Sequence, residues 1–461
     1  MTKLSLMDLA CLVAESEANP KHVAGLLICQ RPPKSRANFV KKVYEAFLSS
    51  TTVEAPFNRV VHFSATAMPS WEDAASINMA DHIFYHKMTT SEDWRQDLYE
   101  MVSGLHIPML ERSRPLWEVH VIDGLPDGKF ALYQKIHHAY ADGIALVRWI
   151  TQCLDSEPGP APLRPVWTLK RSSRAHDEHR QLKMDVLKQA VGGLKGVGMR
   201  FWGIGRLAAM LFLESINLTK NAIAIPYVAN GHTPLNGQVT PGRQFASVCV
   251  PMATINKIRK VTRSSVNHVA LTCIDDALHR YLNEQGIVLD KPITIQMPVD
   301  LRQKGQVVVG NKFGVILVEL STPTDDPYVR LRNIGFSLRN VRNMVDSVVP
   351  EAIETYTLVT GMLGQLGETL NISARMPPMG NMMVSNVQGP SQHLYIMGAK
   401  MEELHPLSTL LPSNLLNLTL FSYAGELYFG MIAADDLPQL NRLGDYLLEA
   451  FDALEAAVCT A

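Results

Sequence analysis

The chain has 461 residues, a length that predicts two or three domains rather than a single core. Its formal net charge of −1 at pH 7 provides no overall field that would favour nucleic acid as a partner. The six cysteines are scattered without CxxC spacing, which argues against a disulfide framework and against a zinc knuckle.

The first third of the chain combines predicted strands with a predicted helix. A continuous apolar run at 23–29 predicts a buried strand. Residues 91–101 predict a helix with Ser91 as its N-terminal cap. Alternating apolar residues at 117–122 and 130–136, separated by the turn DGLPDG, predict an antiparallel hairpin.

The sequence HHAYADG, residues 137–143, begins where the second hairpin strand ends. Apolar residues then recur with helical spacing as far as Leu154, so the motif lies on a strand-to-helix turn. A proline-rich segment without periodicity follows at 156–165 and predicts a linker.

A second region of mixed structure begins near Phe245. Its predicted helices are 254–263, 267–285 and 437–454. Its strand candidates are ITIQMPV, FGVILVEL, MMVSNV, LTLFSY and LYFGMIA, and Ala424-Gly425 predicts a tight turn between the last two. Both halves of the chain therefore mix sheet with helix.

His137 and His138 allow two interpretations: ordinary core or surface residues, or a catalytic base with its neighbour. Adjacent side chains on a strand point to opposite faces, so one ring can face a cleft while the other packs. For the same reason the pair seldom binds one metal ion, and no metal site is expected. A neutral imidazole, with a reference pKa of about 6.5, suits a general base.

The residues that follow the histidines are interpreted as support. Asp142 lies where a helix N-terminus stabilises a carboxylate, and it is expected to hold the turn. Gly143 allows either an unusual backbone angle or a close approach. The sequence has no G-x-S-x-G elbow and no phosphate-binding loop, so the nucleophile is expected to belong to a substrate.

HHxxxDG is the signature of coenzyme A-dependent acyltransferases and related condensation domains. Here it is accompanied by Pro115-Leu116-Trp117, by SNVQGP at 385–390, by LSLMDL and PKHVAG near the start, and by LNLTLFSYAGELYFGMIAADDL. Together these features resemble a bacterial wax ester synthase/diacylglycerol acyltransferase over nearly the whole chain. The resemblance implies an α/β fold of two chloramphenicol-acetyltransferase-like domains with an active site in a tunnel between them.

The resemblance also implies domain limits and a reaction. The first domain, 1–160, would carry HHxxxDG, a linker and helical crossover would span 161–244, and 245–461 would form the second domain. Acyl-CoA would donate its fatty acyl group to diacylglycerol or to a long-chain alcohol, with His138 as the general base. His137 and Asp142 would support the turn, and acyl-CoA would be a substrate, so no cofactor is expected.

An Asn-Asp pair characterises the family at the start of a helix in the second half. Here Asn267 is present, but His268 replaces the aspartate, which puts any role of that carboxylate in doubt. Asn267 either donates a hydrogen bond near the reacting carbonyl, worth about 2.7–4 kcal/mol in other acyl-transfer enzymes, or caps the helix.

The accompanying motifs have structural alternatives. Pro115, Leu116 and Trp117 are expected to be core residues at the start of a strand. The SNVQGP segment is either an ordinary turn or a contact with the site through Asn386, Gly389 and Pro390. Arg302, which follows a predicted strand, is a hypothetical partner for Asp142 across the domains.

The expected acceptors hardly dissolve in water, so contact with lipid is expected. No run reaches the roughly 20 apolar residues of a membrane span, and acidic residues near the start argue against a signal peptide. Residues 184–225, apolar and basic, form either an amphipathic helix in a lipid headgroup layer or a packed crossover. We expect a cytoplasmic protein peripherally associated with the inner membrane or lipid inclusions.

Two other functions remain open from the sequence. Condensation of carrier-protein-bound substrates would use the same histidine turn, but the chain has no attached carrier module. A non-catalytic lipid-binding protein with a decayed site would not need the intact HHAYADG.

Overall fold

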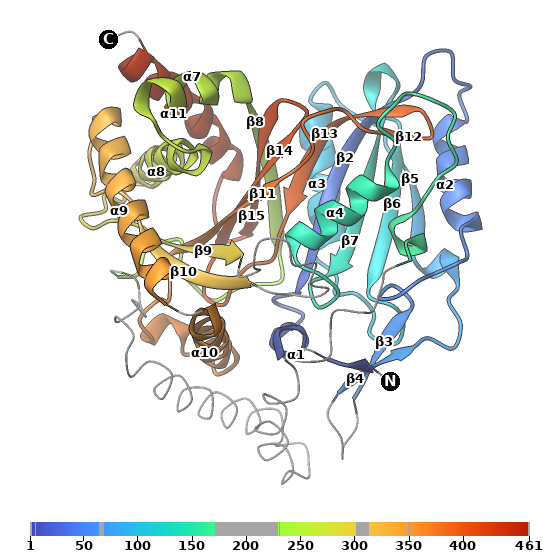
Figure 1. The fold of residues 1–461 in the computed structure, drawn as a ribbon, viewed down its shortest axis with the longest axis horizontal. Helices are drawn as coiled ribbons and strands as arrows, with labels where there is room; N and C mark the ends of the chain where they lie inside the picture. Colours follow the sequence, from blue (N-terminus) through green and yellow to red (C-terminus); the bar gives the residue numbers. More distant parts are fainter. Residues whose placement is uncertain are drawn as a thin grey trace.

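The computed structural model describes residues 2–4, 6–63, 69–170, 229, 231–300, 313–348 and 350–459. Two six-stranded mixed sheets, each with its own helices, form two lobes that stand side by side (Figure 1). The expected α/β class with two lobes is thereby confirmed.

The first lobe is built on a sheet whose neighbouring strands are antiparallel except for β5 and β6. Its strands, in spatial order, are β12 (Tyr395–Ile396), β13 (Ala399–Leu407), β2 (His22–Gln30), β7 (Lys129–His137), β6 (Trp117–Asp123) and β5 (Ile83–Lys87). Helices α2 (Phe39–Ser49) and α4 (Gly143–Cys153) pack on one face and α3 (Trp94–His106) on the other.

The sequence-based assignments hold for most of this lobe. The strand at 23–29 is β2, the hairpin is β6 and β7, and the helix after the histidine motif is α4. The predicted cap of α3 is wrong: the helix begins at Trp94, and Asp93 accepts the hydrogen bond from the Gln96 N–H. Ser91 lies too far upstream to reach the first free N–H groups.

The second lobe is built on a sheet in which β11 runs parallel to both of its neighbours, β9 and β14. Its strands, in spatial order, are β10 (Phe313–Glu319), β9 (Thr294–Asp300), β11 (Met382–Gln388), β14 (Leu416–Tyr423), β15 (Glu426–Ala434) and β8 (Arg243–Pro251). All five predicted strands are present, and Ala424 and Gly425 form the β14–β15 turn with positive φ angles of 48° and 91°.

Helices cover the outer side of the second sheet (Figure 1). The predicted helices are confirmed as α7 (Met252–Thr262), α8 (Val266–Glu284) and α11 (Leu440–Cys459), whereas α9 (Pro327–Ser347) and α10 (Pro350–Thr369) were not predicted. Among the described residues, the other elements are α1 (Leu6–Ala14), a small sheet of β1 (Thr2–Lys3), β4 (Ser70–Asp73) and β3 (Arg59–His62), and the 3-10 turns η1 (Met79–Asp81), η2 (Pro126–Gly128), η3 (Val166–Thr168) and η5 (Ser373–Arg375).

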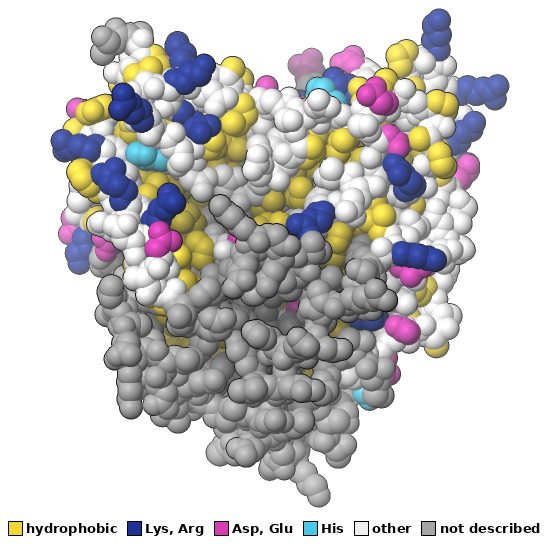
Figure 2. Space-filling view, viewed as in Figure 1, with side chains coloured by type: hydrophobic (Ala, Val, Ile, Leu, Met, Phe, Trp, Pro, Cys, Tyr) yellow, Lys and Arg dark blue, Asp and Glu magenta, His cyan; other side chains and the backbone are white. Residues whose placement is uncertain are grey.

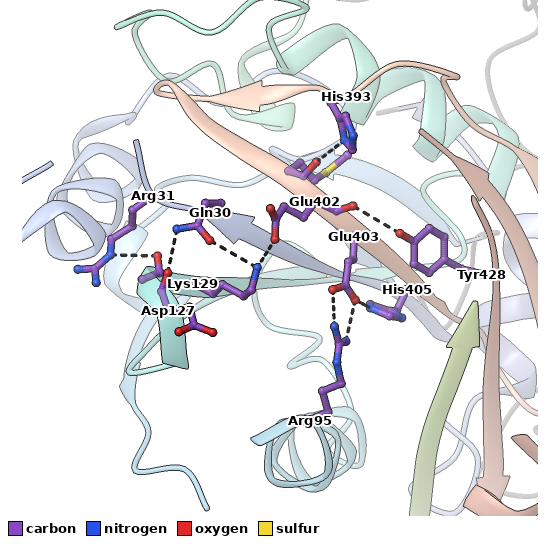
Figure 3. A network of polar contacts seen from close by, with 12 residues as sticks. Gln30, Arg31, Arg95, Asp127, Lys129, His393, Glu402, Glu403, His405 and Tyr428 are labelled. Carbon is purple, nitrogen blue, oxygen red and sulfur yellow. Dashed lines mark hydrogen bonds and ion pairs between the residues drawn. The ribbon is translucent and has the colours of Figure 1, made fainter. Parts of the chain in front are cut away.

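Strand β13 joins the lobes, because it comes late in the chain yet pairs with β2 of the first sheet. Its register shifts between Met401 and Glu403. Figure 3 shows the resulting polar network, in which Glu403 accepts hydrogen bonds from Arg95 on α3. The ring of His405 lies 2.9 Å from Glu403 Oε2 and, through Nδ1, 2.8 Å from Ser247 Oγ on β8. The network therefore connects the two sheets.

Candidate active site

A pocket of about 280 Å³ lies between the lobes. Strands β2 and β7 and helix α4 line it from the first lobe, and β9, β10, β11 and β14 line it from the second. Most of the lining side chains are apolar, and Figure 2 shows hydrophobic side chains in the groove between the lobes. Such a lining suits an acyl chain.

His138 lines this pocket from the turn that follows β7. Its backbone N–H donates to the Lys21 carbonyl oxygen at 2.9 Å, and its ring lies 5.9 Å from the ring of Phe313 on β10. Burial lowers the pKa of His138 below 6.5, opposed by the Asp142 carboxylate and by a hydrogen bond to its own backbone. The imidazole is therefore neutral at neutral pH, as a base must be.

His137 points the other way, into the interior of the first lobe, and is 0% exposed. Its Nδ1 accepts a hydrogen bond of 3.0 Å from the Ala139 N–H, and its Nε2 lies 3.3 Å from Glu15 Oε1. The two adjacent rings therefore divide as strand alternation predicts, one in the pocket and one in the core.

Asp142 and Gly143 fix the turn into α4. Asp142 is buried, and its Oδ1 accepts from the Ala145 N–H at 2.9 Å, so it caps the helix. A Cβ atom on Gly143 would lie 3.3 Å from Val387 Cγ2 on β11. Of the two interpretations of Gly143, the structure therefore supports close approach between the lobes.

Asn267 lies in the first turn of α8 but does not cap it. The Ser265 side chain accepts from the His268 N–H at 3.1 Å, so the interpretation of Asn267 as the cap is wrong. Asn267 Oδ1 instead accepts a hydrogen bond from Asn386, an exposed residue of β11 that lines the pocket. Asn267 therefore does not line the pocket itself but contacts Asn386, which does.

His268, at the position where the resemblance implies an aspartate, lies between α8 and α9. Its Nε2 lies 2.6 Å from the Leu331 carbonyl oxygen, so the ring donates there. A Cβ atom on Gly335 would lie 2.7 Å from His268 Cε1, so a side chain at position 335 would collide with the ring, and glycine leaves room for it. The ring thus fastens the start of α8 to α9.

The PLW segment is core, as expected, with Pro115 buried and both Leu116 and Trp117 1% exposed. The Leu116 carbonyl accepts from the His137 N–H at 3.0 Å, and its N–H donates to Tyr140 Oη at 2.9 Å. The segment therefore holds the histidine turn through hydrogen bonds to His137 and Tyr140.

The SNVQGP segment is both a tight structural element and a contact with the pocket, the two interpretations that its sequence allowed. Gly389 makes a close approach, since a Cβ atom there would lie 2.4 Å from Phe421 Cζ and 2.5 Å from the Ser422 oxygen. Asn386 and Pro390 nevertheless line the pocket. The segment is therefore a tight strand end that also forms part of the pocket wall.

Some of the predicted and observed residues do not correspond. Arg302 and residues 184–225 lie outside the described residues, so their predicted roles stay predictions. Phe313 and Glu15 contact the two histidines but were not predicted, because both contacts come from segments distant in sequence. No local spacing signals either contact.

Known proteins match this architecture along the whole chain. The model of the wax ester synthase/diacylglycerol acyltransferase catalytic domain matches residues 4–270, and that of the WS/DGAT C-terminal domain matches residues 309–455. A putative diacylglycerol O-acyltransferase of Mycobacterium tuberculosis is 30% identical over 460 residues, covering 99% of this chain and 100% of the relative. The probable diacylglycerol O-acyltransferase Tgs4 of the same species is 28% identical over 472 residues, covering 100% and 98%.

Solved structures agree. The wax ester synthase/diacylglycerol acyltransferase from Marinobacter aquaeolei VT8 matches with a TM-score of 0.79 and 29% identity, covering 100% of both chains. The trichothecene 15-O-acetyltransferase of Fusarium sporotrichioides, with a TM-score of 0.58 and 14% identity over 99% of this chain and 94% of its own, shares the fold alone. The chain therefore belongs to the wax ester synthase/diacylglycerol acyltransferase family of acyltransferases, as its motifs predicted.

Proposed function

We propose that this chain transfers a long-chain fatty acyl group from acyl-CoA to diacylglycerol or to a long-chain alcohol, with His138 as general base. The observation that carries the proposal is the position of His138, a neutral imidazole in a largely apolar pocket that both lobes line. The names of the relatives add diacylglycerol and wax ester synthesis as the classes of reaction.

The proposed reaction needs no protein nucleophile. The His138 imidazole takes the hydroxyl proton as the acceptor oxygen attacks the thioester carbonyl, which forms a tetrahedral oxyanion. Asn267 and Asn386 carry amide N–H groups beside the pocket that would donate to this charge. Collapse breaks the carbon–sulfur bond, and the departing thiolate takes the proton from His138 to give free CoA and an ester.

The other histidine and the aspartate have positioning roles in this proposal. His137 and Asp142 are buried and hydrogen-bonded to backbone N–H groups on the turn. Rigid backbone on both sides of His138 would keep its ring within reach of the acceptor hydroxyl, which is where much of the rate of such reactions originates.

The test uses purified protein with palmitoyl-CoA and either hexadecanol or diacylglycerol, and follows free thiol together with the ester product. We expect thiol release that depends on the acceptor and is abolished in His138→Ala. The exposed His62, replaced by alanine, is the matched control and should retain full activity. Acceptor-dependent release that persists in His138→Ala would refute the proposal.

Peripheral contact with lipid is also part of the proposal, because both acceptor classes reside in lipid. Along the part of the chain that the structure describes, no helix is long and apolar enough to span a bilayer. The apolar, basic residues 184–225 are the proposed contact. Replacing Lys195 and Arg200 with glutamine should weaken cosedimentation with anionic vesicles, and unchanged binding would exclude this segment.

A further inference from the structure

Glu15, just after α1, is a buried carboxylate that touches the histidine turn. Its side chain is 0% exposed, and Oε1 lies 3.3 Å from His137 Nε2. The same oxygen accepts from the Lys21 N–H at 3.1 Å, and Oε2 accepts from Arg112 at 2.9 Å. Two of these contacts are hydrogen bonds from N–H donors, and the third is a close approach of a ring nitrogen.

The hydrogen bond from Ala139 selects the tautomer of His137. Its Nδ1 accepts from the Ala139 N–H, so the ring proton lies on Nε2, the atom that faces Glu15. Burial alone would raise the pKa of Glu15, but contacts with His137, Lys21 and Arg112 lower it to about 2. The carboxylate therefore stays ionised and acts as a fixed acceptor.

Glu15 also connects to His138 through the backbone. The Lys21 N–H is held by Glu15, and the Lys21 carbonyl accepts from the His138 N–H at 2.9 Å. One carboxylate thus lies against the ring of the first histidine and accepts a hydrogen bond from the residue whose carbonyl holds the second.

The segment between Glu15 and Lys21 is also fastened outside the first sheet. Lys21 Nζ donates to the Leu410 carbonyl at 3.0 Å, and Arg243 of β8 donates to the Ala18 carbonyl at 2.8 Å. A shift of the segment would therefore move the histidine turn relative to the opposite wall of the pocket.

We propose that Glu15 is a positioning residue for the acyl transfer, acting through His137 and Lys21 to hold the His138 ring in the pocket. Glu15 does not line the pocket, so this role involves no contact with substrate. The inference rests on the proposed function, because the reaction is what the position serves.

The first test is Glu15→Gln, which keeps the size of the side chain but turns an N–H group toward donors. We expect kcat to fall by about 10- to 100-fold while KM for both substrates stays essentially unchanged, since a displaced base slows chemistry without weakening binding. Glu17→Gln is the matched control: it removes an exposed carboxylate two residues away and should leave both constants unchanged. Thermal unfolding of each variant shows that the assays compare folded protein.

A double substitution tests the route. If Glu15 acts through His137, adding Glu15→Gln to His137→Gln should cost much less than the product of the two separate losses. Losses that multiply, or an unchanged kcat in Glu15→Gln, would overturn the proposal.

A second readout does not depend on activity. In protein labelled with ¹⁵N-histidine, we expect a protected Nε2–H signal that disappears in His137→Gln and in Glu15→Gln but remains in Glu17→Gln. Retention of this signal in Glu15→Gln would overturn the proposal. If the wild-type protein transfers no acyl group to any acceptor, the proposed function fails, and this signal still decides whether Glu15 holds His137.

Discussion

In the first lobe, the residues around His138 in the pocket wall come from one short stretch of chain, whereas the residues of the second lobe that face or flank them come from segments far apart in sequence. His138, Asp142 and Gly143 lie within six residues on the β7–α4 turn. Phe313 and Asn386 lie on β10 and β11, and Asn267 on α8 is hydrogen-bonded to Asn386 from behind the wall. The first wall is therefore specified locally and the second only by the complete fold.

This difference assigns the walls different tasks. The local wall holds the proposed base in a fixed geometry through helix capping and backbone hydrogen bonds. The assembled wall contributes apolar surface and amide groups, and it depends on how α8 and α9 pack. Substitutions in the first wall should therefore slow chemistry, and substitutions in the second should combine smaller kinetic effects with losses of stability.

The largest expected effect is at the cap of α4. Asp142→Ala removes the acceptor of the Ala145 N–H and frees the turn, so we expect kcat to fall about 100-fold. The control is Asp93→Ala, which removes the equivalent cap of α3 outside the pocket. Both should lose about 1 kcal/mol in the free energy of unfolding, but only Asp142→Ala should lose turnover. Equal kinetics in the two variants would contradict a special role for the turn.

A smaller effect is expected at the amide pair of the second wall. Asn386→Ala should lower kcat about tenfold, less than a fully enclosed oxyanion donor gives, because Asn386 is exposed to water that weakens its hydrogen bonds. Asn267→Ala in the same background should add little, since the two amides are bonded to one another. Independent losses would show that the two residues act separately.

Introducing at position 268 the aspartate that the resemblance implies should be harmful in this chain. His268→Asp places a carboxylate where the Leu331 carbonyl oxygen needs a donor, so we expect about 1–3 kcal/mol lower free energy of unfolding and a few-fold lower kcat. Gly335→Ala should act in the same direction, because its Cβ would displace the ring. Chemical denaturation measures both, and a more stable His268→Asp would refute the packing argument.

The smallest effect concerns acid stability. The folded pKa of Glu15 is about 2, below its ordinary value of 4.5, so the folded state binds the proton less tightly than the unfolded state does. Its stabilising contribution is present above pH 4.5 and is lost as pH falls toward 2. Glu15→Gln should therefore show a shallower loss of stability over this window than the wild-type protein in denaturation measured at each pH. An identical pH dependence would contradict the assignment.

The locally specified wall is also the part that the sequence predicts well. Alternation predicts β6 and β7, helical spacing predicts α4, and Asp142 stands at the position that a cap occupies. These signals act over a few residues, so they do not depend on the tertiary packing of the rest of the chain.

Where the predictions fail, two local options compete or a distant segment decides. Ser91 and Asp93 are both good caps, as are Ser265 and Asn267, and the backbone selects the one that immediately precedes the first helical residue. Strand β13 gives no clean alternation, because its register shift lies between Met401 and Glu403, where two charged residues are adjacent in sequence. The contact of Glu15 with His137 joins segments far apart in sequence, so no local pattern predicts it.

The pH dependence of kcat/KM for acyl transfer tests most directly whether a neutral His138 takes the acceptor proton. Because burial lowers the pKa of His138, the rate should rise with pH through one ionisation below 6.5 and then reach a plateau. A rate without an acid limb, or with a limb centred above 6.5, would contradict the account.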